Sequence, residues 1–246
     1  IPKRTEETSR SKMRQRIDAV IRLAHAYKQD ARPTYHHVDF TEFGGVEVEV
    51  HYRPSFMNNL VYNHRLQQWF EEQAGEQFAH SVVLPEETGT IQVPTHAFNR
   101  IFQMAHISNH FFHEGIGLRQ LLDYYYVLQQ GFTEEERLQD GQLLRGFGLY
   151  KVAAAVMYVL QEAFALTPEH MIVAPDRKRG HFLLDEILQG GNFGQYDKRT
   201  ADSHSPFAKN LQRLKRDVRL LRYFPSECLW EPIFRLWHFF WRMRNR

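Results

Sequence analysis

Three ionisable residues alternate along one short segment of the chain, at Glu47, Glu49 and His51. Valines fill the positions between them, so a β-strand would place the two carboxylates and the imidazole on one face. Carboxylates two residues apart on a strand lie ~7 Å from each other and repel unless a cation compensates. Such a face suits a metal site with hard oxygen ligands, such as Mg²⁺. The alternative is a solvated acidic face that meets the basic first helix.

A second group of histidines has helical spacing, at His106, His110 and His113. Two histidines at i and i+4 have the ligand spacing of zinc hydrolases, which place a glutamate directly after the first histidine. Ile107 occupies that position here, so the zinc signature is incomplete. We therefore expect hydrogen-bonded histidines where this helix meets the strands. A metal hydrolase built on His106 and His110 is the alternative.

Arg119 and Asp123 form a possible ion pair at i and i+4, directly after a Gly-Ile-Gly turn. On a surface, such a pair stabilises a helix by a few tenths of a kcal/mol. Apolar neighbours suggest partial burial, so we expect the pair to orient its helix rather than to contact substrate. We expect the same supporting role for His51, His106 and His110. The sequence has no phosphate-binding loop, dinucleotide fingerprint or hydrolase elbow.

A β-hairpin is predicted to position the acidic segment, because Gly44 and Gly45 supply the positive φ that its loop requires. Beyond Pro94 every long periodic segment is helical, and Thr133 with Glu136 forms a capping box. The predicted strands cover 35–40, 46–53, 81–84 and 90–93. The predicted helices cover 9–30, 61–73, 96–113, 116–130, 133–145, 148–165, 180–189, 206–223 and 229–244.

The change in composition near residue 94 predicts an α+β fold, in which a small mixed β-sheet with flanking helices is followed by an all-helical domain. The predicted domains are 1–93 and 94–246. The longest apolar stretch, 152–160, has nine residues, fewer than the ~20 that a membrane span needs. The single cysteine, Cys228, is compatible with a reducing compartment, so we expect a cytoplasmic protein.

The net charge of +2 is unevenly distributed. Residues 1–28 carry eight Lys or Arg against three acids, and residues 207–246 carry ten against three. Basic ends could meet nucleic acid, phosphates or anionic lipid. We favour solvated helix faces, because neither end has the strands or glycine loops of common nucleic-acid modules. Nucleic acid is therefore not the expected partner.

The last predicted helix carries an aromatic stripe of Trp230, Phe234, Trp237 and Trp241. Ile233, Phe240 and Met243 widen this stripe. Such a helix could lie on a membrane surface. Because most of its circumference is apolar, we expect it to pack against the helical bundle instead.

Several segments together resemble the bacterial "uncharacterised nucleotidyltransferase" family, a branch of the DNA polymerase beta-like superfamily. The resemblance runs from about residue 35 to 200, and its most specific part is Gly-Leu-Arg-x-x-x-Asp at 117–123. The other segments that carry it are Val46–Arg53, Val93–Thr95, Ala105–His106, His110–Glu114 and Gly190–Gly194.

The resemblance implies the C-terminal part of a nucleotidyltransferase palm over 1–93 and a helical bundle over 94–246. It also implies that two Mg²⁺ ions assist transfer of a nucleoside monophosphate from a nucleoside triphosphate to an acceptor. In such a palm two carboxylates come from a Gly-Asp-x-Asp strand and a third from an adjacent strand. Glu49 is the expected third carboxylate and metal ligand, with Glu47 as second choice.

The 246 residues contain no Gly-Asp-x-Asp. One interpretation is a catalytically inactive protein that kept the fold as a binding or scaffold module. The other is that a segment carrying this strand belongs between Thr5 and Glu6, since Pro2, Arg4 and Thr5 resemble what the family carries just before it.

Overall fold

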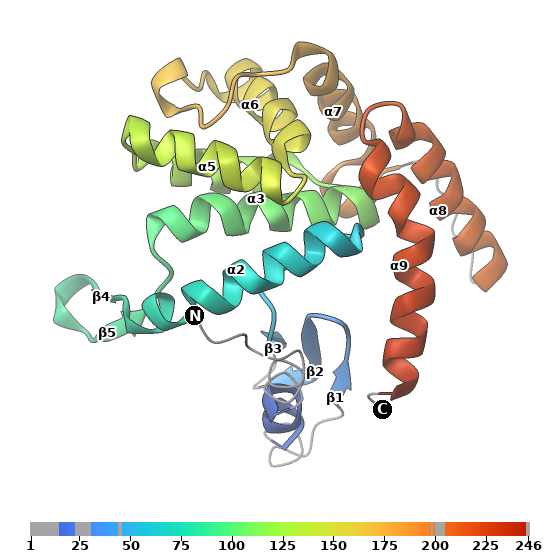
Figure 1. The fold of residues 1–246 in the computed structure, drawn as a ribbon, viewed down its shortest axis with the longest axis horizontal. Coiled ribbons are helices and arrows are strands. Elements are labelled where there is room, and N and C mark those ends of the chain that lie inside the picture. The colour runs from blue at the N-terminus through green and yellow to red at the C-terminus, as the bar shows by residue number, and fades with distance from the viewer. Residues whose placement is uncertain (1–14, 23–30, 44–45, 198, 200–204, 245–246) are drawn as a thin grey trace. The chain divides into compact units, whose positions relative to one another are not determined.

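The computed structural model describes residues 15–22, 31–43, 46–197, 199 and 205–244 (Figure 1). The chain divides into two compact units: a sheet unit, Ile1–Ser55 with Leu236–Arg246, and a helical unit, Phe56–Arg235. The boundaries of these units differ from the domain boundary between residues 93 and 94, which was predicted from the change in composition. That domain boundary stays a prediction. The predicted break between Thr5 and Glu6 lies outside the described residues.

The sheet unit contains a three-stranded antiparallel sheet in the order β1-β2-β3. The β2–β3 hairpin confirms both predicted strands, with an irregular register between Phe40 and Phe43. Residues 15–22 are helical, inside the predicted helix over 9–30. The strands are β1 (Ala31–Pro33), β2 (His37–Phe43) and β3 (Val46–His51).

A small apolar core supports this hairpin. Ile17 from the helical segment, Val38 from β2 and Tyr52 at the end of β3 are all buried. Side chains that pack against them include Val50 and Trp241. Since Val38 faces this core, His37 next to it along β2 faces the other way.

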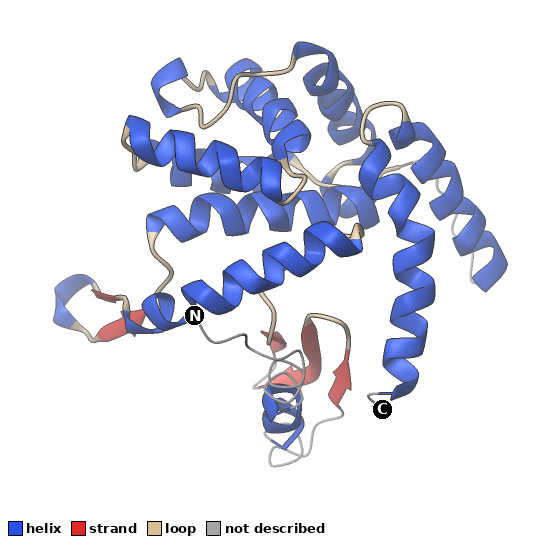
Figure 2. Cartoon of the chain, in the orientation of Figure 1, coloured by secondary structure: helices blue, strands red, loops and turns tan. Residues whose placement is uncertain are grey.

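The helical unit holds most of the helices and a separate antiparallel pair of short strands (Figure 2). All the predicted elements of this region are present, with ends that shift by a few residues. The strands are β4 (Ser81–Val83) and β5 (Thr90–Gln92). The helices are α2 (Leu60–Ala79), α3 (His96–His113), α4 (Leu118–Gln129), α5 (Glu134–Gly146), α6 (Tyr150–Phe164), α7 (Arg177–Gly190), α8 (Pro206–Leu221) and α9 (Pro225–Arg244), whose last turns belong to the sheet unit.

Capping residues explain where several of these helices begin. Asn59 accepts hydrogen bonds from the backbone N–H groups of Val61 and Tyr62 at the start of α2. Asp176 caps α7 through the N–H of Arg179, so this helix begins before residue 180, where it was predicted to start. The capping box at Thr133 is confirmed at the start of α5.

Helix α6 lies at the centre of the helical core. Its run from Val152 to Leu160 is buried at every position, which explains why it is apolar around the whole helix. Helix α7 approaches it closely at Gly180, where an added Cβ would lie 2.3 Å from Cδ1 of Tyr158. Glycine is therefore required at this crossing.

The aromatic stripe of helix α9 contacts different partners along its length. Phe234 is buried and stacks on Phe56 in the helical unit, while Trp237 and Trp241 contact the ring of Tyr35 in the sheet unit. The expected packing against the helical bundle is thus observed at Phe234, whereas the two tryptophans pack in the sheet unit. The three residues expected to widen it are at least half exposed: Ile233, Phe240 and Met243.

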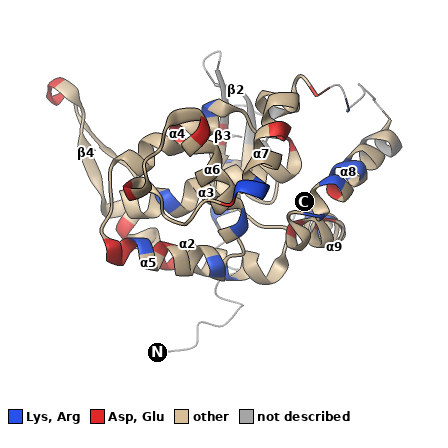
Figure 3. Cartoon of the chain, turned by 90° about the horizontal axis from the view of Figure 1, so that it is seen from above, with Lys and Arg blue, Asp and Glu red and all other residues tan. Residues whose placement is uncertain are grey.

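The architecture is α+β, as predicted, with a predominance of helices. The strand pairs that the structure describes are all antiparallel, whereas a mixed sheet was expected. Within the described residues, no helix combines the length and apolar character needed to cross a membrane. The basic charge expected near the C-terminal end is visible along α8, which carries Arg213, Lys215, Arg216 and Arg219 (Figure 3).

Candidate functional site

The β2–β3 hairpin carries the side chains with the most evident chemistry. Its register pairs His37 with His51 and Asp39 with Glu49. Glu49 and His51 are exposed, whereas Val50 between them packs against the small core, as the alternating pattern predicts. The side chains of Glu47, Val46 and Val48 lie outside the described part of the structure.

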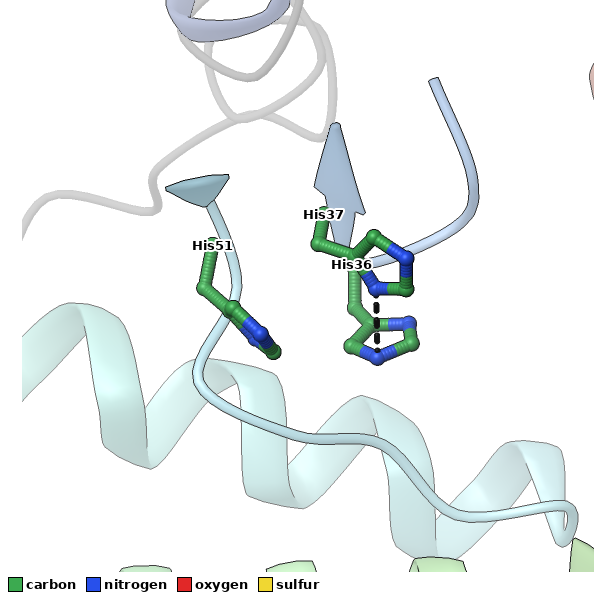
Figure 4. Close-up of side chains that lie close together, drawn as sticks. All are labelled: His36, His37 and His51. Atoms are coloured by element: carbon green, nitrogen blue, oxygen red, sulfur yellow. Dashed lines mark hydrogen bonds between the residues drawn. The ribbon is translucent and has the colours of Figure 1, made fainter. Parts of the chain in front are cut away.

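Three histidines meet at the open end of this hairpin (Figure 4). Nδ1 of His37 lies 2.9 Å from Nε2 of His36, and the ring of His51 lies 5.2 Å from each of the other two rings, between centroids. One ring nitrogen from each of His36, His37 and His51 lies within 4.8 Å of the others. Imidazoles gathered in this way can bind a transition metal.

Backbone hydrogen bonds hold the two adjacent histidines in place. The hydroxyl of Thr34 accepts from the N–H groups of His36 and His37, and the carbonyl of His36 accepts from the N–H groups of Tyr52 and Arg53. Because Tyr52 and Arg53 directly follow β3, these hydrogen bonds connect the start of β2 to the end of β3. The histidine cluster therefore rests on a backbone that is already ordered.

Glu49 extends the polar face beside the cluster. Its Oε2 lies 3.3 Å from Nε2 of His51, and its side chain is 60% exposed. An exposed contact of this kind contributes little to stability. Its carboxylate therefore stays accessible to a proton donor or a cation.

The histidines of α3 lie in the helical unit and form a different arrangement. Nε2 of His110 lies 3.0 Å from Nε2 of His106, and its Nδ1 lies 3.0 Å from Oε2 of Glu114. The hydrogen bond with His110 lowers the pKa of Glu114. Among the described residues, the hairpin is where three potential ligands converge, so a metal site on His106 and His110 lacks a described third ligand.

His113, the last histidine of this helix, contacts the surrounding fold through both of its ring nitrogens. Burial lowers its pKa to about 4. Its Nδ1–H donates to the carbonyl of Asn109, and its Nε2 lies 3.1 Å from Oδ1 of Asn58. This environment is typical of a histidine that supports the fold.

The motif that contains Arg119 and Asp123 packs against the Gly190–Gly194 segment. Both charged residues are exposed. The contact comes instead from Gln120, whose Nε2 donates to Oδ1 of Asn192 at 2.6 Å. A Cβ on Gly117 would lie 3.1 Å from Cα of Asn192. Two segments that carry the family resemblance are thus in direct contact.

His36, His37 and the buried Arg100 were not among the predicted site residues. Counting outward from the Gly-Gly loop places His37 opposite Tyr52, and the register shift between Phe40 and Phe43 brings it opposite His51 instead, so the sequence carried no simple signal for this pairing. Arg100 is 1% exposed, and its Nε donates to Oδ2 of Asp140 at 2.5 Å. No local pattern distinguishes this arginine from one on the surface of a helix.

The chain was compared with known protein families, with curated proteins and with solved structures. The model of the uncharacterised nucleotidyltransferase family matches residues 9–168, which include the hairpin and helices α2 to α6. Neither the curated proteins nor the solved structures gave a match. Since the matched region covers more than half of the 246 residues, the chain belongs to the uncharacterised nucleotidyltransferase family.

Proposed function

We propose that this chain takes part in the transfer of a nucleoside monophosphate from a nucleoside triphosphate to an acceptor hydroxyl. The observation that carries the proposal is the exposed carboxylate of Glu49 on a strand of the family-matched region. The acceptor oxygen attacks the α-phosphorus, and the bond to the bridging oxygen breaks, so that pyrophosphate leaves. Glu49 accepts the proton of the acceptor hydroxyl.

The resemblance implies Mg²⁺, which would stabilise the charge that develops on the phosphate oxygens. Mg²⁺ takes oxygen ligands in near-octahedral geometry. The described side chains at the hairpin offer one carboxylate, that of Glu49, beside three imidazoles. They do not make a Mg²⁺ site by themselves. The role assigned to this chain is therefore proton transfer by Glu49, with Glu47 as a second candidate.

A transfer assay with a matched pair of variants tests this role. The protein is incubated with each of the four nucleoside triphosphates, a divalent cation and pools of sugar, protein and RNA acceptors, and pyrophosphate release and labelled product are measured. Glu49→Gln should lower the rate by about 10²–10⁴-fold. Glu72→Gln, at an exposed position of α2, is the control and should leave the rate unchanged. Equal rates in both variants would remove Glu49 from the mechanism.

The second candidate function is a catalytically inactive binding or scaffold protein with the family fold. The absence of Gly-Asp-x-Asp from the 246 residues favours it, because a two-metal transfer needs more than one carboxylate. Absence of pyrophosphate release with all four nucleotides, together with retained nucleotide binding in a calorimetric titration, would support this function over transfer.

A further inference from the structure

We propose that His36, His37 and His51 form a binding site for a divalent transition metal of the zinc type. The site is separate from the Mg²⁺ that the family resemblance implies. Imidazole nitrogen suits Zn²⁺, Co²⁺, Ni²⁺ and Cu²⁺, whereas Mg²⁺ and Ca²⁺ take oxygen. The donor chemistry of the cluster therefore selects the first group of metals.

The spacing of the nitrogens matches a shared cation. With Zn–N distances of 2.0–2.1 Å, two nitrogens on one zinc ion lie roughly 2.9–3.4 Å apart, depending on the angle between them. Nδ1 of His37 and Nε2 of His36 are 2.9 Å apart. One ring nitrogen of His51, whose ring is exposed, lies within 4.8 Å of a ring nitrogen of each of the other two histidines.

The site is ordered before any ion binds. The Thr34 hydroxyl and the backbone of Tyr52 and Arg53 hold the His36–His37 step, as described above. The hydroxyl of Tyr52 also donates to the carbonyl of Thr34. Because two of the ligands are adjacent in sequence and the third is fixed by strand register, the chain loses little further conformational freedom when the ion binds.

Glu49 adds a carboxylate at the edge of the cluster, 3.3 Å from Nε2 of His51. A carboxylate next to a metal-binding histidine orients the ring and raises its basicity. Three protein ligands leave a coordination position open, as in catalytic zinc sites. Partial exposure of the histidines provides a path for the ion from solvent.

Metal binding is tested on untagged, chelator-treated protein without nucleotide, so the result is independent of the proposed transfer. Co²⁺ is the spectroscopic probe, and Zn²⁺ is titrated by calorimetry and by competition with Co²⁺. We expect one equivalent of Zn²⁺, visible absorption bands of nitrogen-bound Co²⁺, and no competition from millimolar Mg²⁺. Zn²⁺ should also raise the melting temperature, because it binds the folded state.

Variants locate the site. His36→Ala, His37→Ala and His51→Ala should each weaken Zn²⁺ binding by about 100-fold or more, and Glu49→Gln by about 10–100-fold. His64→Ala, at an exposed position of α2, is the control and should bind like the wild type. Circular dichroism is used to check that each variant is folded. His51→Gln repeats the test with a side chain that is polar and larger than alanine.

Three outcomes would overturn the proposal. The first is no Zn²⁺ binding at millimolar concentration. The second is binding that the hairpin variants leave unchanged. The third is one equivalent that disappears in a His106→Ala, His110→Ala double variant and persists in His51→Ala, which would place the ion on α3.

Discussion

A buried arginine in the helical unit and the ionisable groups at the hairpin of the sheet unit lie in opposite environments. In the helical unit Arg100 is enclosed between α3 and α5, where Asp140 and Glu136 both accept from its guanidinium. In the sheet unit Glu49, His36, His37 and His51 stay partly or largely open to solvent above a core of a few side chains. The difference indicates that the buried pair of Arg100 and Asp140 specifies the fold, while the ionisable groups at the hairpin are available for chemistry.

Removing the partner of the buried arginine should have the largest effect on stability. Asp140→Ala leaves the guanidinium of Arg100 buried with its main partner gone, so we expect a loss of about 3–5 kcal/mol in the free energy of unfolding. Urea denaturation measures it. Asp123→Ala, at an exposed position of α4, is the matched control and should change stability by about 0.5 kcal/mol or less. Comparable losses in both variants would contradict the structural role of the buried pair.

Two glycines test how closely the helices of the helical unit pack. Gly180→Ala places a Cβ against Tyr158 and should cost about 1–3 kcal/mol. Gly75→Ala, in α2, meets nothing within 4 Å and should stabilise the protein by about 0.5–1 kcal/mol. Thermal denaturation of both variants should show a lower melting temperature for Gly180→Ala and a higher one for Gly75→Ala. A stabilising Gly180→Ala would mean that α6 and α7 are further apart than described.

A buried carboxyl at the start of α9 should make stability depend on pH. Burial raises the pKa of Glu227 to about 7, and its Oε2 accepts from the N–H of Asn58 at 2.7 Å. Because the folded state favours the protonated form, this contribution is complete below the unfolded pKa of about 4.5 and declines as pH rises toward 7. Glu227→Gln keeps the acceptor and cannot ionise.

The difference in urea midpoint between Glu227→Gln and the wild type should therefore grow from about pH 4.5 to pH 7 in favour of the variant. Subtracting the wild type at each pH removes the opposite contribution of His113, whose stabilising effect is lost as pH falls toward about 4. A difference that stays constant over this range would show that Glu227 is ionised throughout.

The smallest effect on stability is expected at the hairpin. Glu49→Gln and His51→Ala replace exposed side chains, so each should change the free energy of unfolding by about 0.5 kcal/mol or less in metal-free protein. The same variants should change metal binding or transfer as described above. A large loss of stability in either variant would mean that the hairpin groups support the fold, and the contrast between the two units would fail.

Local patterns predicted the secondary structure well, because the interactions that form helices and turns span a few residues. The helix over 96–113 was predicted at both ends, and the capping box at Thr133 lies where it was expected. Helix α9 begins four residues earlier than predicted, at Pro225, a residue that suits a first helical position. The aromatic stripe on α9 was correctly assigned to packing, although Ile233, Phe240 and Met243 turned out to be exposed.

The site was predicted in part. Alternation along Val46–His51 identified one polar strand face, because side chains on a strand have a period of two whatever surrounds them. Pairing between strands places His36 and His37 next to this face. The packing of α3 on α5 buries Arg100 in the core. Those contacts depend on segments 14 and 40 residues away in the chain, so no short window of sequence contains them. The sequence by itself thus determined which elements form and which residues share a face. The tertiary structure alone decided which faces meet, because burial and register depend on the free energy of the whole packed chain.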